Sequence, residues 1–242
     1  MAVHLKSVTL HPEGYPTREH YPFNLAVLQQ TRRLTFEVPV TVFVGENGAG
    51  KSTLLEALAT ACGIHIWRPH EGFRYEVNPH EDTLWRHLSV EWTGERVPGS
   101  FFEADVARHF AFLLDEWAAD DPGQLKYFGG KSLVTQSYGQ SLLSLFRARY
   151  RIRGLYLMDE PEAALSPRSQ LELLKIIAQA TAAGLAQFII ATHSPLLLAC
   201  PGAVIYSFDR CPVGRIDYEE TEHYQVYRSF LTDRSRWLTE TH

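Results

Sequence analysis

The sequence predicts an α/β fold built on a mainly parallel core sheet with flanking helices. Two observations predict it. In the second half of the chain, short apolar runs alternate with segments of helical periodicity, which is the pattern of successive β–α–β units. Near the start, the run Val40–Val44 contains only β-branched and aromatic residues, which suits a strand buried on both faces. The 242 residues are enough for one large domain or two small ones.

The first forty residues alternate apolar and polar side chains as strands do. We expect one strand at 3–10 and another at Leu34–Glu37, separated by a link that contains two prolines. After the strand at 40–44, a helix should begin at Lys51 and stop at Gly63. Its expected buried face holds Leu54, Leu55, Leu58 and Ala61.

The middle of the chain is less regular. Residues 64–100 are rich in His, Trp, Arg and Glu and are interrupted by prolines, so we expect few regular elements there. Helical spacing of apolar residues predicts a helix at Phe101–Trp117 and an amphipathic helix at Ser141–Tyr150. A turn at Asp121–Gly123 should separate them.

The last ninety residues return to the strand–helix alternation. We expect buried strands at Leu155–Met158 and Gln187–Ala191, with a helix between them that Ser166 caps and Pro167 begins. The expected buried face of that helix holds Leu171, Leu174, Ile177 and Ala178. The closing elements are expected to be strands at Val204–Phe208 and Arg215–Tyr218 and a helix at Glu220–Leu231.

Composition excludes some classes of protein. Lys plus Arg number 23 and Asp plus Glu 28, so the net charge of −5 excludes a strongly basic protein that coats nucleic acid by charge alone. The three cysteines fit a reducing compartment, with each thiol expected to be a small buried side chain. No apolar run approaches the roughly 18 to 20 residues of a membrane span, and the N-terminus lacks a secretory signal. We therefore expect a cytoplasmic protein.

The segment after the strand at 40–44 matches the phosphate-loop pattern GxxxxGKS in full. The residues are Gly45, Glu46, Asn47, Gly48, Ala49, Gly50, Lys51 and Ser52, followed by Thr53. Glycines allow backbone N–H groups to turn toward a triphosphate, and the following helix N-terminus adds positive charge. Lys51 can reach the β- and γ-phosphates, the Ser52 hydroxyl can ligate Mg²⁺, and Thr53 can touch the α-phosphate. The alternative is a glycine turn that merely joins a strand to a helix.

Two acids stand at the end of the predicted strand 155–158. A magnesium ion beside a phosphate loop needs a carboxylate at the tip of a parallel strand, and Asp159 meets that need. Glu160 would then polarise the attacking water. The alternative for both acids is an ordinary strand-to-loop cap.

A polar residue also follows the predicted strand 187–191. His193 can hydrogen-bond the γ-phosphate and sense its presence, since Ser194 and Pro195 already supply a helix start. The expected catalytic residues are therefore Lys51, Glu160 and His193, and the expected metal ligands are Ser52 and Asp159. The alternative for His193 is a structural histidine at a strand end.

These motifs resemble the ATP-binding-cassette (ABC) ATPase superfamily, most closely its non-transporter branch of RecF/SMC-like and overcoming-lysogenization-defect-like AAA family ATPases. The segments that carry the resemblance are GENGAGKST at 45–53, LYLMDEPEAALSP at 155–167 and ATHSP at 191–195. The segment QSYGQS at 136–141 is similar to the LSGGQ signature of that family, about twenty residues before the acidic strand. Tyr138 replaces a signature glycine, and no clear glutamine loop is present, although Glu103 or Asp105 could substitute.

The resemblance implies a P-loop NTPase fold of the ABC-ATPase head type, with an antiparallel β subdomain and a small helical signature subdomain. It divides a single domain, residues 1–242, into a nucleotide-binding core at 1–63 and 154–242 and an insert at 64–153 that carries the signature. Tyr21 and Phe23 are candidates for stacking on adenine. Neither a coiled-coil arm nor a nuclease domain is expected, because no heptads occur and few residues follow the last strand.

The resemblance also implies ATP and Mg²⁺ as ligands and two nucleotides sandwiched between two heads. Ser137, Gly139 and Gln140 would contact the γ-phosphate held by the second subunit, and Ala163–Ser166 would cross to its site. Three functions follow from it. The first is an ATPase that drives or gates a DNA-repair, DNA-maintenance or phage-defence partner, on DNA or with a nuclease. The second is a regulatory or scaffold subunit with little turnover, and the third is the ATP-binding subunit of a transporter.

Two smaller features have competing interpretations. Arg147, Arg149, Arg151 and Arg153 alternate in sequence. They either contact a nucleic-acid backbone or form a solvated helix end, and the acidic net charge favours the second interpretation. The histidines at 65, 70, 80, 87 and 109 fit no common metal-ligand spacing and are interpreted as scattered loop and surface residues.

Overall fold

The computed structural model describes residues 3–67, 78–104 and 138–238 of the chain. The strands are β1 (Leu5–Leu10), β2 (Arg33–Thr35), β3 (Val40–Val44), β4 (Leu88–Trp92), β5 (Gly99–Glu103), β6 (Gly154–Asp159), β7 (Ala186–Ala191), β8 (Val204–Ser207) and β9 (Gly214–Ile216). The helices are α1 (Ala26–Gln30), α2 (Lys51–Ala61), α4 (Tyr138–Arg149), α5 (Pro167–Ala182), α6 (Pro195–Leu198), α7 (Glu222–Thr232) and α8 (Arg234–Leu238). Short 3₁₀ turns include η2 (Leu84–His87), η4 (Pro161–Ala164) and η5 (Tyr218–Glu220).

The strands form two sheets. The larger has the order β5-β6-β7-β3-β8-β9 and is parallel except for β9, which runs antiparallel to β8. The smaller is antiparallel, with the order β2-β1-β4. This confirms the predicted α/β class, the mainly parallel core and the antiparallel β subdomain.

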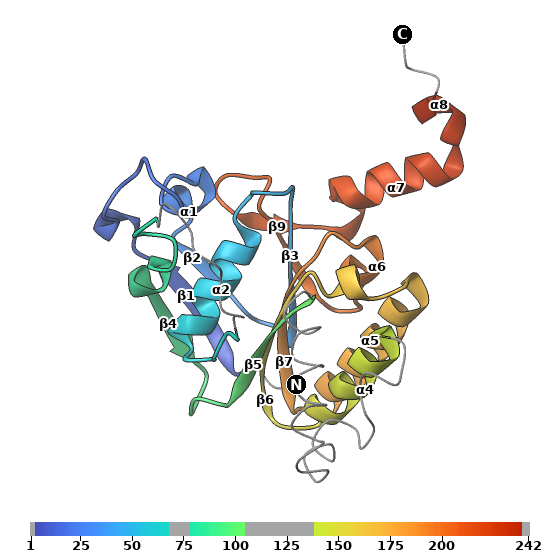
Figure 1. The fold of residues 1–242 in the computed structure, drawn as a ribbon, viewed down its shortest axis with the longest axis horizontal. Coiled ribbons are helices and arrows are strands. Elements are labelled where there is room, and N and C mark those ends of the chain that lie inside the picture. Colours follow the sequence, from blue (N-terminus) through green and yellow to red (C-terminus); the bar gives the residue numbers. More distant parts are fainter. Residues whose placement is uncertain (1–2, 68–77, 105–137, 239–242) are drawn as a thin grey trace.

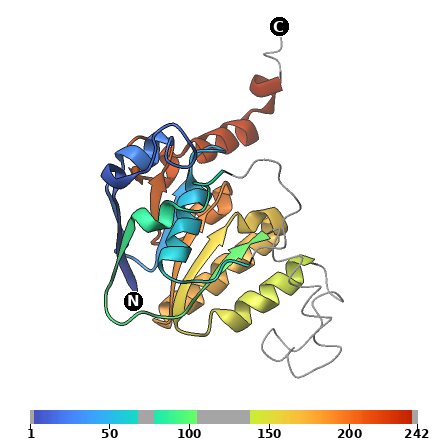
Figure 2. The same ribbon diagram turned by 60° about the vertical axis from the view of Figure 1, so that its left-hand side comes forward.

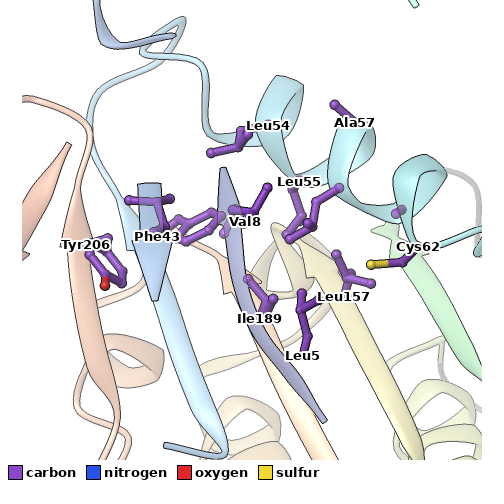
Figure 3. Packing of buried hydrophobic residues seen from close by; sticks show 14 of the residues in the cluster. Leu5, Val8, Phe43, Leu54, Leu55, Ala57, Cys62, Leu157, Ile189 and Tyr206 are labelled. Carbon is purple, nitrogen blue, oxygen red and sulfur yellow. The ribbon is translucent and has the colours of Figure 1, made fainter. Parts of the chain in front are cut away.

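Helix α2 lies between the two sheets, while α4 and α5 lie on the opposite side of the larger sheet (Figures 1 and 2). One apolar core joins α2 to both sheets: Leu54 and Leu55 of the helix pack with Leu5 and Val8 of β1 and with Leu157 of β6 (Figure 3). A second core lies under α4 and α5. The phosphate-loop helix is therefore held on two sides, which fixes its N-terminus against the larger sheet.

The two sheets are also joined by one buried amide. Gln187 of β7 is fully buried, and its Oε1 accepts hydrogen bonds from the backbone N–H groups of His4 (2.8 Å) and Leu5 (2.7 Å). Its Nε2 donates to the Leu5 carbonyl oxygen at 2.9 Å. A single side chain thus satisfies three backbone groups at the start of β1.

The expected helix at Phe101–Trp117 is wrong at its start. Residues 99–103 are strand β5, which pairs in parallel with β6 from Gly99↔Leu155 to Glu103↔Asp159, and residues 105–117 lie outside the described part of the chain. Gly99 is tightly packed there, since a Cβ would lie 2.4 Å from Cδ1 of Ile64. Hydrogen bonding to a neighbouring strand overrides local helical spacing.

The buried face of α5 is rotated from the expected one. Ile177 is buried as expected, but Leu171 is 46% exposed, and the buried stripe runs through Gln170, Leu173, Ile176, Ile177 and Ala180. Both stripes have helical spacing, so the packing partner decides between them. The predicted cap is confirmed: the Ser166 hydroxyl accepts from the Ser169 N–H, and Pro167 begins the helix.

The cysteines also differ from expectation. Cys62 and Cys200 are buried, but Cys211 is exposed in the turn between β8 and β9 rather than packed against the strand. The expected strand 215–218 is the shorter β9, and the expected last helix is α7. Within the described ranges, no helix is long and apolar enough to cross a membrane.

Candidate nucleotide-binding site

The carboxyl ends of four neighbouring strands converge on one edge of the larger sheet. β3 leads into the phosphate loop, β6 ends at Asp159, β7 leads to His193, and β8 leads to Asp209. The order β6-β7-β3 puts the strand of the histidine between the phosphate-loop strand and the acidic strand. In open α/β sheets, this edge is where ligands bind.

The phosphate loop has the backbone geometry that an anion cradle requires. Gly45, Gly48 and Gly50 all have positive φ values, of 152°, 79° and 98°. Within the described part of the chain, no side chain caps the N-terminus of α2, whereas Ser166, Ser194 and Thr221 cap α5, α6 and α7. The first-turn amides of α2 can therefore face an anion, and the helix dipole favours one there.

The Lys51 side chain lies inside this loop. It is only 4% exposed, and its Nζ donates hydrogen bonds to the carbonyl oxygens of Gly45 (2.7 Å) and Glu46 (3.0 Å). Burial lowers the pKa of the Lys51 ammonium, while the nearby carboxylates of Glu160 and Asp159 oppose that change. The cation is thus held at the centre of the loop and surrounded by acids.

Ser52 and Asp159 meet across the site: the Ser52 Oγ donates to Oδ1 of Asp159 at 3.0 Å. Burial raises the pKa of the Asp159 carboxyl to about 7, the Ser52 hydrogen bond opposes this, and Glu160, Glu56 and Glu103 add to it. A hydroxyl and a buried carboxylate crowded by other acids are hard oxygen donors that a cation would stabilise. These residues therefore fit Mg²⁺, and Ser52 with Asp159 would hold it.

Glu160 has the one positive φ of a non-glycine residue in the described chain, 43°. Its backbone N–H donates to the Ala191 carbonyl oxygen at 2.9 Å, which holds the chain in that conformation, and its side chain is 45% exposed. Residues in the left-handed region cost free energy and cluster at functional sites. The conformation turns the carboxylate out of the strand toward the same edge as His193.

His193 lies opposite Glu160, with Nε2 at 3.5 Å from the Glu160 Oε1. That Nε2 is buried and makes no hydrogen bond with any residue that the structure describes. Burial lowers the pKa of the His193 imidazole, and Lys51 lowers it further. The imidazole is therefore held neutral beside the phosphate loop.

Three further residues of the site were missed by sequence reasoning. Oε1 of Glu162 accepts hydrogen bonds from the backbone N–H groups of His193 and Ser194, so it fixes the backbone of these two residues. Oδ1 of Asp209 accepts from the Glu46 N–H at 2.7 Å, which anchors the phosphate loop. His223, on α7, contacts His193. Two of them carried a sequence signal: Asp209 follows a predicted strand, and Glu162 lies inside the segment 155–167 that carries the family resemblance.

Of the two candidate residues for stacking on adenine, one is accessible to a ligand and the other is buried. Phe23 is fully buried and cannot stack on a base. Tyr21 is 41% exposed and lies beside the loop, with its OH 2.8 Å from Oγ1 of Thr53.

The signature segment is described only in part. Ser137 and the alternative glutamine-loop residue Asp105 lie outside the described residues, while Gly139 and Gln140 lie in the first turn of α4. A Cβ at Gly139 would lie 3.5 Å from the Ala164 carbonyl oxygen, so the signature helix approaches the segment Ala163–Ser166 of the same chain. Glu103, the other substitute, lies opposite Asp159 in the β5–β6 pairing.

The alternating arginines lie at and beyond the last turn of α4. Arg147, Arg149, Arg151 and Arg153 are exposed, and Arg147 lies 3.7 Å from Glu172. Their position at a helix C-terminus agrees with the solvated interpretation. Among the described residues, no group of three or more His, Cys, Asp or Glu side chains could by itself hold a metal ion.

The sequence is similar to those of known protein families and of two curated transport proteins. The family "AAA domain, putative AbiEii toxin, Type IV TA system" matches residues 132–199, and the family "AAA domain" matches residues 23–70. "Thiamine import ATP-binding protein ThiQ" of Cereibacter sphaeroides is 30% identical over 168 residues, 63% of this chain and 69% of that protein. The protein of the same name from Ruegeria sp. is 24% identical over 174 residues, with the same coverage.

Among solved structures, the SMC head domain from Thermotoga maritima aligns with a TM-score of 0.47 at 14% identity, over 89% of this chain and 100% of that one. An ATP-binding subunit of an ABC transporter aligns with a TM-score of 0.48 at 18% identity, over 96% of this chain and 100% of that one.

The fold and the strand-end site define a P-loop nucleoside triphosphatase. The chain belongs to the ABC/AAA-type P-loop ATPases, because a 30% identical relative of that class is matched over more than two thirds of its length. It is an ATPase, and the family implies ATP as its nucleotide.

Proposed function

We propose that this ATPase binds Mg²⁺-ATP at the phosphate loop and hydrolyses its β–γ phosphoanhydride bond. The observation that carries the proposal is the convergence of Lys51, the Ser52–Asp159 pair, Glu160 and His193 at one sheet edge. Backbone N–H groups of residues 45–53 cradle the phosphates, and the Lys51 ammonium stabilises negative charge on the β- and γ-phosphates.

The remaining residues have separate roles in this proposal. Ser52 and Asp159 hold Mg²⁺, which neutralises developing phosphate charge when bound. The exposed Glu160 carboxylate accepts a hydrogen bond from the attacking water and orients it toward the γ-phosphorus. His193 donates from Nε2 to a γ-phosphate oxygen, and Tyr21 packs against the adenine.

We propose further that ATP closes two heads into a dimer, as the family resemblance implies. Ser137, Gly139 and Gln140 of one subunit contact the γ-phosphate held by the other, and Ala163–Ser166 lies at the boundary. Loss of the γ-phosphate removes charge-assisted hydrogen bonds to both subunits, so the dimer reopens after hydrolysis.

The proposed role of this cycle is to drive or gate a partner in DNA repair, DNA maintenance or phage defence, and the family match to an AbiEii-type AAA domain supports it. A second candidate is the ATP-binding subunit of a transporter. The named relatives support that candidate, because they are thiamine-import ATP-binding proteins.

Light scattering of a Glu160→Gln protein tests the site and the dimer together. We expect ATP binding to persist, hydrolysis to fall at least a hundredfold, by about 3 kcal/mol of transition-state stabilisation, and the dimer to accumulate with ATP. Glu162→Gln is not a suitable control, because the Glu162 carboxylate holds the backbone N–H groups of His193 and Ser194. The control is Glu172→Gln, at a partly exposed side chain on α5, which should behave as wild type. A Glu160→Gln protein that stays monomeric with ATP contradicts the sandwich.

The phosphate loop and the partner need separate tests. Lys51→Ala should abolish nucleotide binding, while the exposed Lys175→Ala leaves it unchanged; normal binding by Lys51→Ala contradicts the assignment. ATP turnover is then compared with duplex DNA and with membrane vesicles that contain a thiamine-type permease. Stimulation by DNA alone supports the DNA-linked role, and stimulation by the vesicles alone supports the transporter role.

A further inference from the structure

Helix α7 contacts His193, the proposed γ-phosphate sensor or switch histidine, through a second histidine, His223. Nε2 of His223, in the first turn of α7, lies 3.0 Å from Nδ1 of His193, and the two ring centroids are 5.1 Å apart. α7 projects from the body of the molecule beyond this contact (Figures 1 and 2). His223 belongs to none of the sequence motifs, and the hydrolysis mechanism has not used it.

The contact restricts where the His193 proton lies. A neutral imidazole carries one N–H, on Nδ1 or on Nε2, and the hydrogen bond made by one nitrogen sets which form is present. If His223 donates from Nε2, Nδ1 of His193 accepts and the His193 proton is on Nε2. Among the described residues, that Nε2 is buried without a hydrogen-bond partner, as is Nδ1 of His223, and it faces the Glu160 side of the site.

A phosphate oxygen only accepts hydrogen bonds, so a neutral His193 can bind it only in the Nε2–H form. We propose that His223 is a positioning residue: it donates to Nδ1 of His193 and thereby holds the switch histidine in the form that donates to the γ-phosphate. This inference rests on the proposed contact between His193 and ATP.

The position of Glu160 supports the donor direction, because its carboxylate lies 3.5 Å from Nε2 of His193 and only accepts hydrogen bonds, which favours a proton on that nitrogen. Burial and Lys51 lower the pKa of the His193 imidazole while Glu160 opposes them, so the charged form, which would donate from both nitrogens, is disfavoured. The backbone of His193 is fixed independently by Glu162, so the ring itself is the remaining freedom. The first turn of α7 is fixed by Thr221, whose hydroxyl accepts from the Tyr224 N–H at 3.3 Å.

The same geometry links α7 to the nucleotide site. α7 begins directly after η5, and the Tyr218 OH in η5 donates to the Pro195 carbonyl oxygen of α6 at 3.0 Å. Tyr218 and His223 therefore both dock the segment 218–223 onto residues 193–195. Of these two side chains, His223 is the one that is hydrogen-bonded to the His193 ring. Variants of Tyr218 and His223 can therefore distinguish a residue that only docks α7 from one that positions the His193 ring.

The experiment compares His223→Phe, which keeps an aromatic ring but cannot donate, with His223→Gln, whose amide can donate, and with Tyr218→Phe. For His223→Phe we expect kcat to fall about five- to tenfold, the effect of one lost hydrogen bond, with KM for ATP nearly unchanged. His223→Gln should recover most of the loss, and Tyr218→Phe should behave as wild type. Nitrogen NMR of the imidazoles, assigned with His193→Ala, should report the Nε2–H form in wild type and a mixture of forms in His223→Phe.

Two results overturn the inference. One is an equal loss of kcat in His223→Phe and Tyr218→Phe with the Nε2–H form retained, which would make the contact a docking contact only. The other is a wild-type kcat in His223→Phe when His193→Ala is impaired. If His193→Ala itself hydrolyses ATP normally, the proposed role of His193 is wrong, and the inference about His223 is wrong with it. Normal nucleotide binding by Lys51→Ala, by contrast, would contradict the phosphate-loop assignment alone.

Discussion

The Ser52 hydroxyl donates a 3.0 Å hydrogen bond to Asp159, although 107 residues separate them and their elements, α2 and β6, are not consecutive. The strand of the phosphate loop, β3, is not the neighbour of β6, because β7 lies between them. Helix α2 crosses over the sheet and brings Ser52 to the carboxylate. The two proposed metal ligands are therefore brought together by a helix–strand contact and not by two adjacent strand ends.

This contact predicts the effect of removing the hydroxyl. Ser52→Ala should need about tenfold more Mg²⁺ for half-maximal ATP hydrolysis, because one of two ligands is lost and the buried Asp159 loses the hydrogen bond that lowers its pKa. Ser52→Thr keeps a hydroxyl and should behave nearly as wild type. Magnesium titration of the ATPase rate measures both, and an unchanged magnesium requirement in Ser52→Ala would contradict the ligand assignment.

The positive φ of Glu160 predicts a trade between stability and activity. Glycine adopts this conformation without the Cβ penalty. The free energy of unfolding of Glu160→Gly should therefore be about 1 kcal/mol higher than that of Glu160→Gln. Both proteins should be inactive. Urea denaturation without nucleotide compares them, and Glu172→Gly, in the middle of α5, is the control that should lose about 1 kcal/mol. Equal stability of the two Glu160 variants would argue against strain.

The bridge from Gln187 predicts a large stability effect far from the nucleotide. Gln187→Leu keeps the approximate size of the side chain but removes the partner of three backbone groups, the N–H of His4 and the N–H and carbonyl of Leu5. At about 1–3 kcal/mol for each unsatisfied group, the free energy of unfolding should fall by roughly 3 kcal/mol or more. Gln179→Leu, on the exposed face of α5, should cost little. A loss below about 1 kcal/mol for Gln187→Leu would mean that β1 satisfies those groups in another way.

Thiol reactivity should separate the three cysteines. Burial raises the pKa of the Cys62 thiol to about 12 and that of Cys200 to about 11, while Cys211 is exposed. The thiolate is the reactive form, so the two buried thiols should react slowly at neutral pH and faster only as the pH rises toward those values. A chromogenic disulfide reagent should therefore titrate one fast thiol at pH 7.5 and all three in denaturant. Loss of the fast phase in Cys211→Ser assigns it, and a second fast thiol would contradict the burial.

Much of the site could be predicted because its signals are local. The phosphate loop is a contiguous run of glycines, lysine and serine between a buried strand and a helix, and Asp159 and His193 each directly follow a buried strand. Carboxyl ends of parallel strands meet at one edge, so these groups were expected to lie together. The mainly parallel sheet followed from the same alternation of strands and helices.

The tertiary structure decided what depends on contacts between distant segments. It set the order β6-β7-β3, made a strand of Gly99–Glu103 where local spacing predicted a helix, and chose which stripe of α5 is buried. It also brought Glu162, Asp209 and His223 to the site. The physical reason is that periodicity and motif spacing record only interactions along the chain. Strand pairing, burial against a partner and hydrogen bonds between distant residues depend on how the elements pack in space.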